Sequence, residues 1–195
     1  MNTRFSLADA IREKASIDEI AKTLDAMSHA ERVAQMGPVG GKLQGALYEM
    51  AHGRTTELSY FVPDGCVNTE VIHEGRNFAP AFNRFQKRFA RIGDEITGYN
   101  EQTFKLFTGP GYFVGEVLDN PEGLKQFAIN YTKTPTQKMP GWPKILPAAA
   151  RLGRFVYGGA HDWMWGISAH MSIGRVHKQG KWHDMWFILT REDTK

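Results

Sequence analysis

The last quarter of the chain holds the pattern that decides the fold: GISAHMSIGRVH (166–177), then KQGK (178–181), then WHDMWFILTR (182–191). Two runs rich in aromatic and β-branched residues flank a short turn that contains glycine, which predicts an antiparallel β-hairpin. The second run is apolar on both faces of the predicted strand, as the neighbours Trp186 and Phe187 illustrate. Such a strand is either buried on both sides or lines a closed cavity.

Further strands are expected upstream of this hairpin. The run QTFKLFTGPGYFVGEVLD (102–119) alternates and is rich in strand-forming residues, with TGPG as a tight connection between two strands. Two more strands are predicted at LKQFAINYTKT (124–134) and GRFVYGG (153–159). A short strand is also predicted at LSYFV (58–62), within an otherwise loop-like stretch.

The first quarter of the chain is helical in pattern. Capping-box spacing, which marks a helix start, occurs at Ser16 with Glu19 and at Ser28 with Glu31. The predicted helices are SLADAIREKA (6–15), SIDEIAKTLDAM (16–27), SHAERVAQM (28–36) and KLQGALYEMAH (42–52).

A fifth helix is predicted at FAPAFNRFQKRFARIG (78–93). Its apolar residues recur at steps of four and three, which is helical spacing. This prediction places Lys87 and the arginines on an outer, basic face. The apolar stripe consists of Phe78, Phe82, Phe85, Phe89 and Ile92.

These elements predict an α+β fold, with N-terminal helices followed by a curved antiparallel β-sheet or barrel. We expect a single domain over residues 1–195, with a helical segment over 1–52 and the sheet or barrel over 75–191. Cys66 is the only cysteine, which excludes an internal disulfide and a cysteine-based zinc site. With no long apolar run and no signal-like start, we expect a cytoplasmic protein without a transmembrane segment.

Positive charge gathers in the second half. Between Gly123 and His183 there are nine Lys or Arg residues, and Asp162 is the only acid. Such a field attracts anions, whether a carboxylate, a phosphate or an acidic partner. A solvated basic surface without a partner is the alternative.

The stretch GGAHDWMWGISAH (158–170) places Asp162 beside His161 and two tryptophans. A carboxylate next to an imidazole suits a general base, and an acid among indoles suits a proton donor. Neighbouring residues on a strand point to opposite faces, so the two side chains need not meet. The alternative is that Asp162 only caps a turn.

Metal and nucleic-acid sites are not expected. The histidines at 161, 170, 177 and 183 match no metal-binding spacing, and we expect neither a metal nor a cofactor. The basic stretch 76–91 resembles a nucleic-acid surface in charge, but its phenylalanines are spaced for a core.

The aromatic content of the second half exceeds what one packed sheet face needs, which predicts an aromatic-lined pocket with a few polar groups. The alternative is that these rings fill a solid core. The candidate ligand-binding residues are Phe104, Phe113, Tyr131, Arg154, Tyr157, Trp163, Trp165, His170 and Trp186.

Four segments between residues 75 and 191 together suggest a known type of barrel. They are GRNFAPAFNRF (75–85), TGPGYFVGEV (108–117), FAINYTKT (127–134) and DMWFILTR (184–191). In strand order and texture, residues 75–191 resemble the calycin-type barrels, the lipocalins and fatty-acid-binding proteins. The resemblance implies an apolar ligand in a barrel mouth. The lipocalin Gly-x-Trp signature is absent, so no family residue is carried over.

The expected function is the binding of a small apolar or amphipathic ligand, with or without an anionic end. One alternative is a cofactor-free acid–base enzyme of isomerase, cyclase or hydrolase type that uses Asp162 and His161. Another is an interaction module that binds an acidic partner through Arg84, Lys87 and Arg88. The sequence predicts no oligomeric state.

Overall fold

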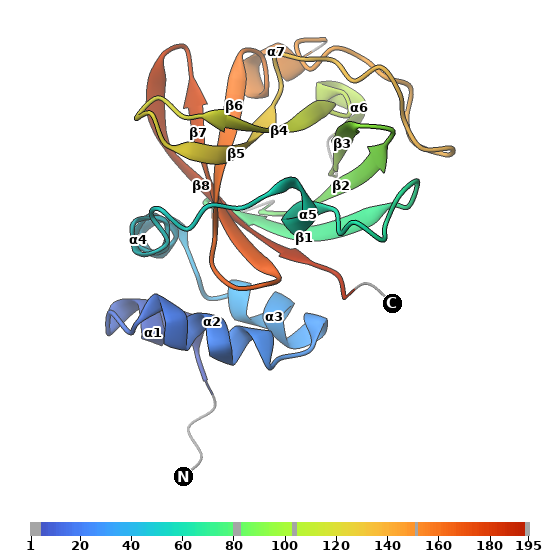
Figure 1. The fold of residues 1–195 in the computed structure, drawn as a ribbon. Helices are drawn as coiled ribbons and strands as arrows, with labels where there is room; N and C mark the ends of the chain where they lie inside the picture. Colours follow the sequence, from blue (N-terminus) through green and yellow to red (C-terminus); the bar gives the residue numbers. More distant parts are fainter. Residues whose placement is uncertain (1–4, 80–82, 103–104, 151, 194–195) are drawn as a thin grey trace.

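The computed structural model describes residues 5–79, 83–102, 105–150 and 152–193. Its strands form a closed antiparallel barrel, in which each strand pairs with the next in sequence and β8 pairs with β1 (Figure 1). The predicted α+β class is therefore confirmed. The strands are β1 (Val71–Asn77), β2 (Arg84–Ile92), β3 (Glu95–Glu101), β4 (Phe113–Asp119), β5 (Lys125–Asn130), β6 (Ala160–Gly166), β7 (Met171–Lys178) and β8 (Lys181–Arg191).

On the inner face of the barrel, glycines lie beneath the aromatic rings of neighbouring strands. A Cβ atom on Gly98 would lie 2.4 Å from the ring of Phe113. A Cβ atom on Gly174 would lie 2.4 Å from the ring of Phe187. Because these positions lack a side chain, the rings lie close over the backbone and a narrow barrel holds many of them.

The four predicted N-terminal helices are confirmed. The capping box at Ser28 and Glu31 is present, whereas the Ser16 hydroxyl accepts a hydrogen bond from the amide of Asp18. The helices are α1 (Leu7–Arg12), α2 (Ile17–Asp25), α3 (His29–Met36) and α4 (Gly41–Met50).

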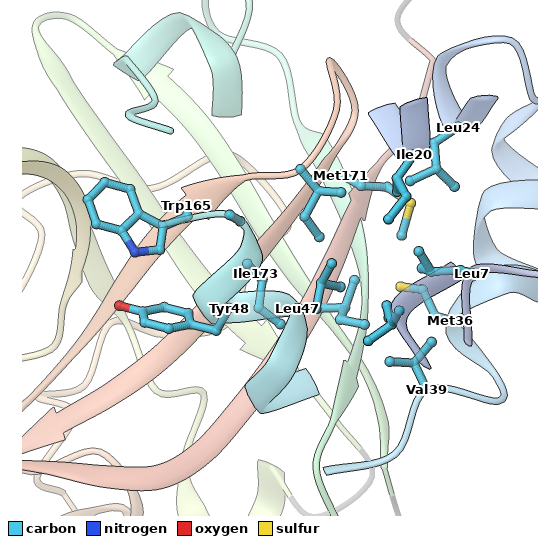
Figure 2. Packing of buried hydrophobic residues seen from close by; sticks show 14 of the residues in the cluster. Leu7, Ile20, Leu24, Met36, Val39, Leu47, Tyr48, Trp165, Met171 and Ile173 are labelled. Carbon is cyan, nitrogen blue, oxygen red and sulfur yellow. The ribbon is translucent and has the colours of Figure 1, made fainter. Parts of the chain in front are cut away.

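These helices cover the outer face of the barrel at β7 and β8. Figure 2 shows Leu47 and Tyr48 of α4 next to Ile173 and Trp165, with side chains of α1, α2 and α3 continuing the same cluster. A hydrogen bond also joins the helices to the barrel: the Asp25 carboxylate of α2 accepts a 2.8 Å hydrogen bond from the amide of Ala169, between β6 and β7. Residues 187–190 of β8 are thus buried on both faces, by the helices outside and by the barrel core inside, whereas the first half of the strand is more exposed.

One end of the barrel is closed by α5 (Leu58–Phe61), so the strand predicted at 58–62 is wrong. The Phe61 ring stacks on Phe127 with centroids 3.8 Å apart, and it is completely buried. The Nε2 atom of His73 donates a 2.9 Å hydrogen bond to the Phe61 carbonyl. The single helical turn of α5 places the Phe61 ring inside the barrel, within the buried aromatic cluster.

The helix predicted at 78–93 is also wrong, because Arg84–Ile92 forms strand β2; residues 80–82 lie outside the described ranges. Phe85 and Phe89 are spaced by four, a separation that places two residues on one face of a helix and equally on one face of a strand. Lys87, between them, shares their inner face. The expected basic outer face therefore loses Lys87 and keeps Arg84 and Arg88.

The remaining segments differ in detail. The C-terminal hairpin is confirmed as β7 and β8, but its first strand begins at Met171 and not at 166, because Gly166 ends β6 and residues 167–170 connect the two strands. The predicted strand at 153–159 instead contains α7 (Gly153–Val156). The TGPG connection is no tight turn between strands, because α6 (Lys105–Thr108) precedes it after β3. Within the described ranges, no helix has the length and apolarity needed to cross a lipid bilayer.

Candidate ligand-binding site in the barrel mouth

The end of the barrel opposite α5 contains a cavity of about 140 Å³. Its walls come from the strand ends at that mouth and from α7. Most of the lining is apolar, and the polar residues gather on the inner strand faces. The lining residues are Asn77, Phe78, Phe85, Lys87, Asn100, Gln102, Tyr131, Val156, Tyr157, Ala160, Asp162, Val176, Met185 and Phe187.

The other half of the barrel interior is filled by side chains. Phe61, Phe89, Phe113 and Phe127 are completely buried and form one cluster there. The Phe89 and Phe113 rings meet edge to face with centroids 5.1 Å apart. This core limits the depth of the cavity, so the barrel combines a solid half with a hollow one, as small eight-stranded barrels do when they hold one small ligand.

A buried ion pair forms the polar part of the cavity. The Nζ atom of Lys87 on β2 lies 3.1 Å from Oδ2 of Asp162 on β6, and the two side chains are only 3% and 8% exposed. The same Nζ atom donates to Oδ1 of Asn100 at 2.9 Å and to the hydroxyl of Tyr131 at 2.5 Å. The pair is therefore well coordinated despite its burial.

Tyr131 and Asn100 complete this cluster. The Tyr131 hydroxyl lies 3.2 Å from Oδ2 of Asp162 and accepts a 3.2 Å hydrogen bond from Nδ2 of Asn100. Asn100 also donates to the carbonyl of Gly111 at 3.0 Å, which anchors the cluster to the loop before β4. We call Lys87, Asn100, Tyr131 and Asp162 the polar cluster.

Burial dominates the electrostatics of the polar cluster. It lowers the pKa of Lys87, and the Asp162 carboxylate opposes that shift. Burial also raises the pKa of Tyr131 well above its usual value, with Asp162 adding to the shift. Aromatic rings surround the ammonium; its Nζ lies 4.9 Å from the Phe187 ring centroid and 5.4 Å from that of Phe113. These faces contribute cation–π attraction that partly replaces lost hydration.

A second polar group lies nearer the rim. Gln102 donates from Nε2 to the Tyr157 hydroxyl at 2.6 Å and to the Thr108 hydroxyl at 3.0 Å. Burial raises the pKa of Tyr157, so its hydroxyl stays protonated at neutral pH. This contact joins the residue that follows β3 to the residue that follows α7.

Of the residues predicted for a site, Asp162, Tyr131 and Tyr157 line the cavity. Phe113 lies in the core directly below it, with its ring centroid 5.6 Å from that of Tyr131. Phe104 lies outside the described residues.

The other predicted residues lie elsewhere. His161 and Trp163 alternate with Asp162 and stack on each other on the outer wall, so His161 and Asp162 do not meet. Trp165 and Trp186 pack against the N-terminal helices. Arg154 is exposed on α7, and His170 lies at the opposite end of the barrel, 3.6 Å from Asp193.

The sequence pattern placed Lys87 on an outer basic face, and it pointed to neither Lys87 nor Asn100 nor Gln102 as a lining residue of the pocket. Asn100 lies near the end of β3, and Gln102 directly follows that strand. Polar residues are common at strand ends, so these two gave no signal of a site. The available signal was the alternation of residues 85–89, in which Lys87 stands midway between two phenylalanines.

Within the part of the chain that the structure describes, no three His, Cys, Asp or Glu side chains lie close enough to hold a metal ion. The lining of the cavity offers hydrogen-bonding groups, one ion pair and apolar side chains. Comparisons with models of known protein families, with curated protein sequences and with solved structures found no match to this chain.

Proposed function

We propose that this protein binds a small, mostly apolar molecule, about the size of one aromatic ring, in the mouth of its barrel. The observation that carries the proposal is a cavity with aromatic walls that ends on the buried pair of Lys87 and Asp162. Apolar walls with a few convergent polar groups are the usual composition of small-molecule sites.

The buried ion pair supports a binding role over a purely structural one. Replacing such a pair by apolar side chains of similar volume is often neutral or stabilising, so the fold alone gives little reason to keep it. Here the pair faces a hollow space that two apolar side chains could have filled. Binding of a ligand to the polar cluster would explain why the ion pair is kept.

The volume restricts the ligand. An apolar cavity of about 150 Å³ accepts a benzene molecule, so about 140 Å³ suits one ring and excludes a long acyl chain. Removing about 100 Å² of apolar ligand surface from water contributes about 2.5 kcal/mol. The resemblance to calycin-type barrels supports the location of the site, at the mouth, while the volume argues for a smaller ligand than a fatty acid.

A cofactor-free acid–base enzyme is a second candidate, supported by the carboxylate of Asp162 in the cavity wall. In that case the groups that contact the catalytic carboxylate are Lys87 and Tyr131, and His161 takes no part. Conversion of a bound compound, lost in Asp162→Asn with binding retained, would favour this candidate over a carrier.

The test measures binding of toluene and phenol by calorimetry or by NMR titration. Ala160 lines the cavity and has a small side chain, so Ala160→Phe should fill the space and weaken binding at least tenfold. Leu124→Phe, in the turn at the opposite end, is the matched control and should bind as the wild type does. Failure of every ring-sized compound to bind at millimolar concentration would sink the proposal.

A further inference from the structure

We infer that the ligand of this cavity is a neutral molecule that donates a hydrogen bond, such as a phenol or an aromatic amine, to Oδ1 of Asp162. The inference rests on the proposed function, because it concerns the same cavity. It follows from counting which hydrogen-bonding positions of the polar cluster are already used and which still face the cavity.

Lys87 has no donor left for a ligand. An ammonium group carries three N–H donors. Its three partners are Oδ1 of Asn100, the hydroxyl of Tyr131 and Oδ2 of Asp162. A carboxylate or phosphate could reach this cation only by displacing one of these bonds, so the positive charge is not available as an anion site.

Tyr131 and Asn100 are used in the same way. The Tyr131 hydroxyl accepts from Lys87 and from Asn100, and it lies within donating distance of Oδ2 of Asp162. The Asn100 amide donates to Gly111 and Tyr131, and its oxygen accepts from Lys87. Neither residue offers the ligand an unused donor.

Asp162 keeps one position open. Both hydrogen bonds that its carboxylate receives from the described residues end on Oδ2. The side chain is only 8% exposed, yet the residue lines the cavity. Oδ1 therefore receives no hydrogen bond from the described residues, and an occupant of the cavity can reach it. A hydrogen bond to a charged group contributes more than one between neutral groups, so a ligand that donates to this oxygen gains affinity.

Gln102 adds a second acceptor of the same kind. Both of its amide N–H groups are used, by Thr108 and Tyr157, while the residue lines the cavity near the rim. Among the described residues no hydrogen bond reaches its Oε1. Open acceptors therefore lie at both levels of the cavity, and a ligand with two donors would satisfy both.

Charge separates the remaining ligand classes. An anionic ring compound would bring its charge to the open oxygen of a carboxylate, where the neighbouring Lys87 ammonium has no donor left. A cationic one would add a second positive charge beside Lys87, whose charge Asp162 already balances. A neutral donor avoids both costs, so the basic charge of the second half does not select the ligand of this cavity.

The first experiment compares phenol, toluene and benzoate on the wild-type protein by calorimetry near neutral pH. The three compounds share a ring and differ in the group that would meet Asp162. We expect phenol to bind about tenfold to a hundredfold more tightly than toluene, since a hydrogen bond to a charged group has that value. Benzoate should bind more weakly than toluene.

The second experiment uses Asp162→Asn, which places an amide where the open oxygen was. The preference for phenol over toluene should fall to about threefold or less, because an amide nitrogen there donates and does not accept. Glu116→Gln makes the same carboxylate-to-amide change on the outer wall, where Glu116 pairs with Lys133, and should leave the preference unchanged.

The outcomes separate the two proposals. If none of the three compounds binds, the proposed function fails. If toluene binds as tightly as phenol, or benzoate binds best, the cavity is a ligand site but the inference about its ligand is overturned. The wild-type series decides this even if Asp162→Asn does not fold, which circular dichroism would reveal.

Discussion

The Nζ atom of Lys87 lies 3.1 Å from Oδ2 of Asp162, although the two residues are 75 positions apart in sequence. Lys87 is on β2 and Asp162 on β6, four strands apart around the closed ring, so the pair spans the barrel interior from one wall to the opposite one. The contact ties the two walls together and separates the solid core from the hollow mouth.

Breaking this pair should destabilise the protein. Lys87→Met leaves a buried carboxylate with one partner fewer, and we expect the free energy of unfolding to fall by about 3–5 kcal/mol. The double variant Lys87→Met with Asp162→Asn should lose much less than the sum of its single changes, because each single change leaves an unpaired buried charge and the double change leaves none. Urea denaturation of the three variants measures this coupling.

The exposed pair of Lys125 and Asp119 is the control for this cycle. Changing Lys125 to Met should cost about 0–1 kcal/mol, since surface ion pairs contribute little. Strict additivity of Lys87→Met and Asp162→Asn would contradict the geometry described above.

Gly98→Ala should also destabilise the barrel. A Cβ atom there would lie 2.4 Å from the Phe113 ring and 2.5 Å from the carbonyl oxygen of Arg88, and the backbone carbonyl has little room to move. Overpacking of this kind costs about 1–3 kcal/mol, measurable by thermal or urea unfolding. Gly65→Ala, with no heavy atom within 4 Å of the added carbon, is the control and should stay close to the wild type.

Low pH should destabilise the protein through His73, the residue that donates a hydrogen bond to Phe61 of α5. Burial lowers the pKa of His73 to about 3, whereas a histidine in the unfolded chain titrates near 6.5. Between these values the unfolded chain binds a proton that the folded protein does not, so the free energy of unfolding falls as the pH decreases from about 6.5 toward 3. Above pH 6.5 the imidazole is neutral in both states and this contribution is constant.

The measurement is urea unfolding at a series of pH values. His73→Gln should flatten the acid side of the stability curve by an amount on the order of a few kcal/mol, while His52→Gln, at an exposed site, should leave the slope unchanged. Burial lowers the pKa of His161, His170 and His177 in the same direction, so some acid sensitivity remains in the variant. Identical slopes for the two variants would refute the assignment to His73.

Removal of the N-terminal helices should expose the outer face of β6, β7 and β8. Trp165, Ile173 and Ile188 are at most 1% exposed beneath these helices. A chain that begins after α4 would present these side chains to water and should aggregate or unfold; light scattering and circular dichroism would show either result. This experiment also tests whether residues 1–195 form a single domain: a soluble, folded barrel would argue that the helices are a separate unit.

The sequence predicted those elements whose pattern is local. Capping residues and apolar stripes predicted α1 to α4, and alternation around a glycine turn predicted the hairpin of β7 and β8. It failed at β2, where phenylalanines at 85 and 89 fit a helical face and a strand face equally well. It also failed at α5 and α7, because a single helical turn is too short to leave a periodic pattern.

What the sequence determined by itself is the α+β class, the four leading helices and an aromatic second half with one acid among its bases, because these features depend on neighbours a few residues apart. Only the tertiary structure decided that Asp162 faces inward while His161 faces outward, and that Lys87 meets Asp162 inside the barrel. Those relationships depend on register and on closure of the sheet, which bring together strands that no local pattern relates.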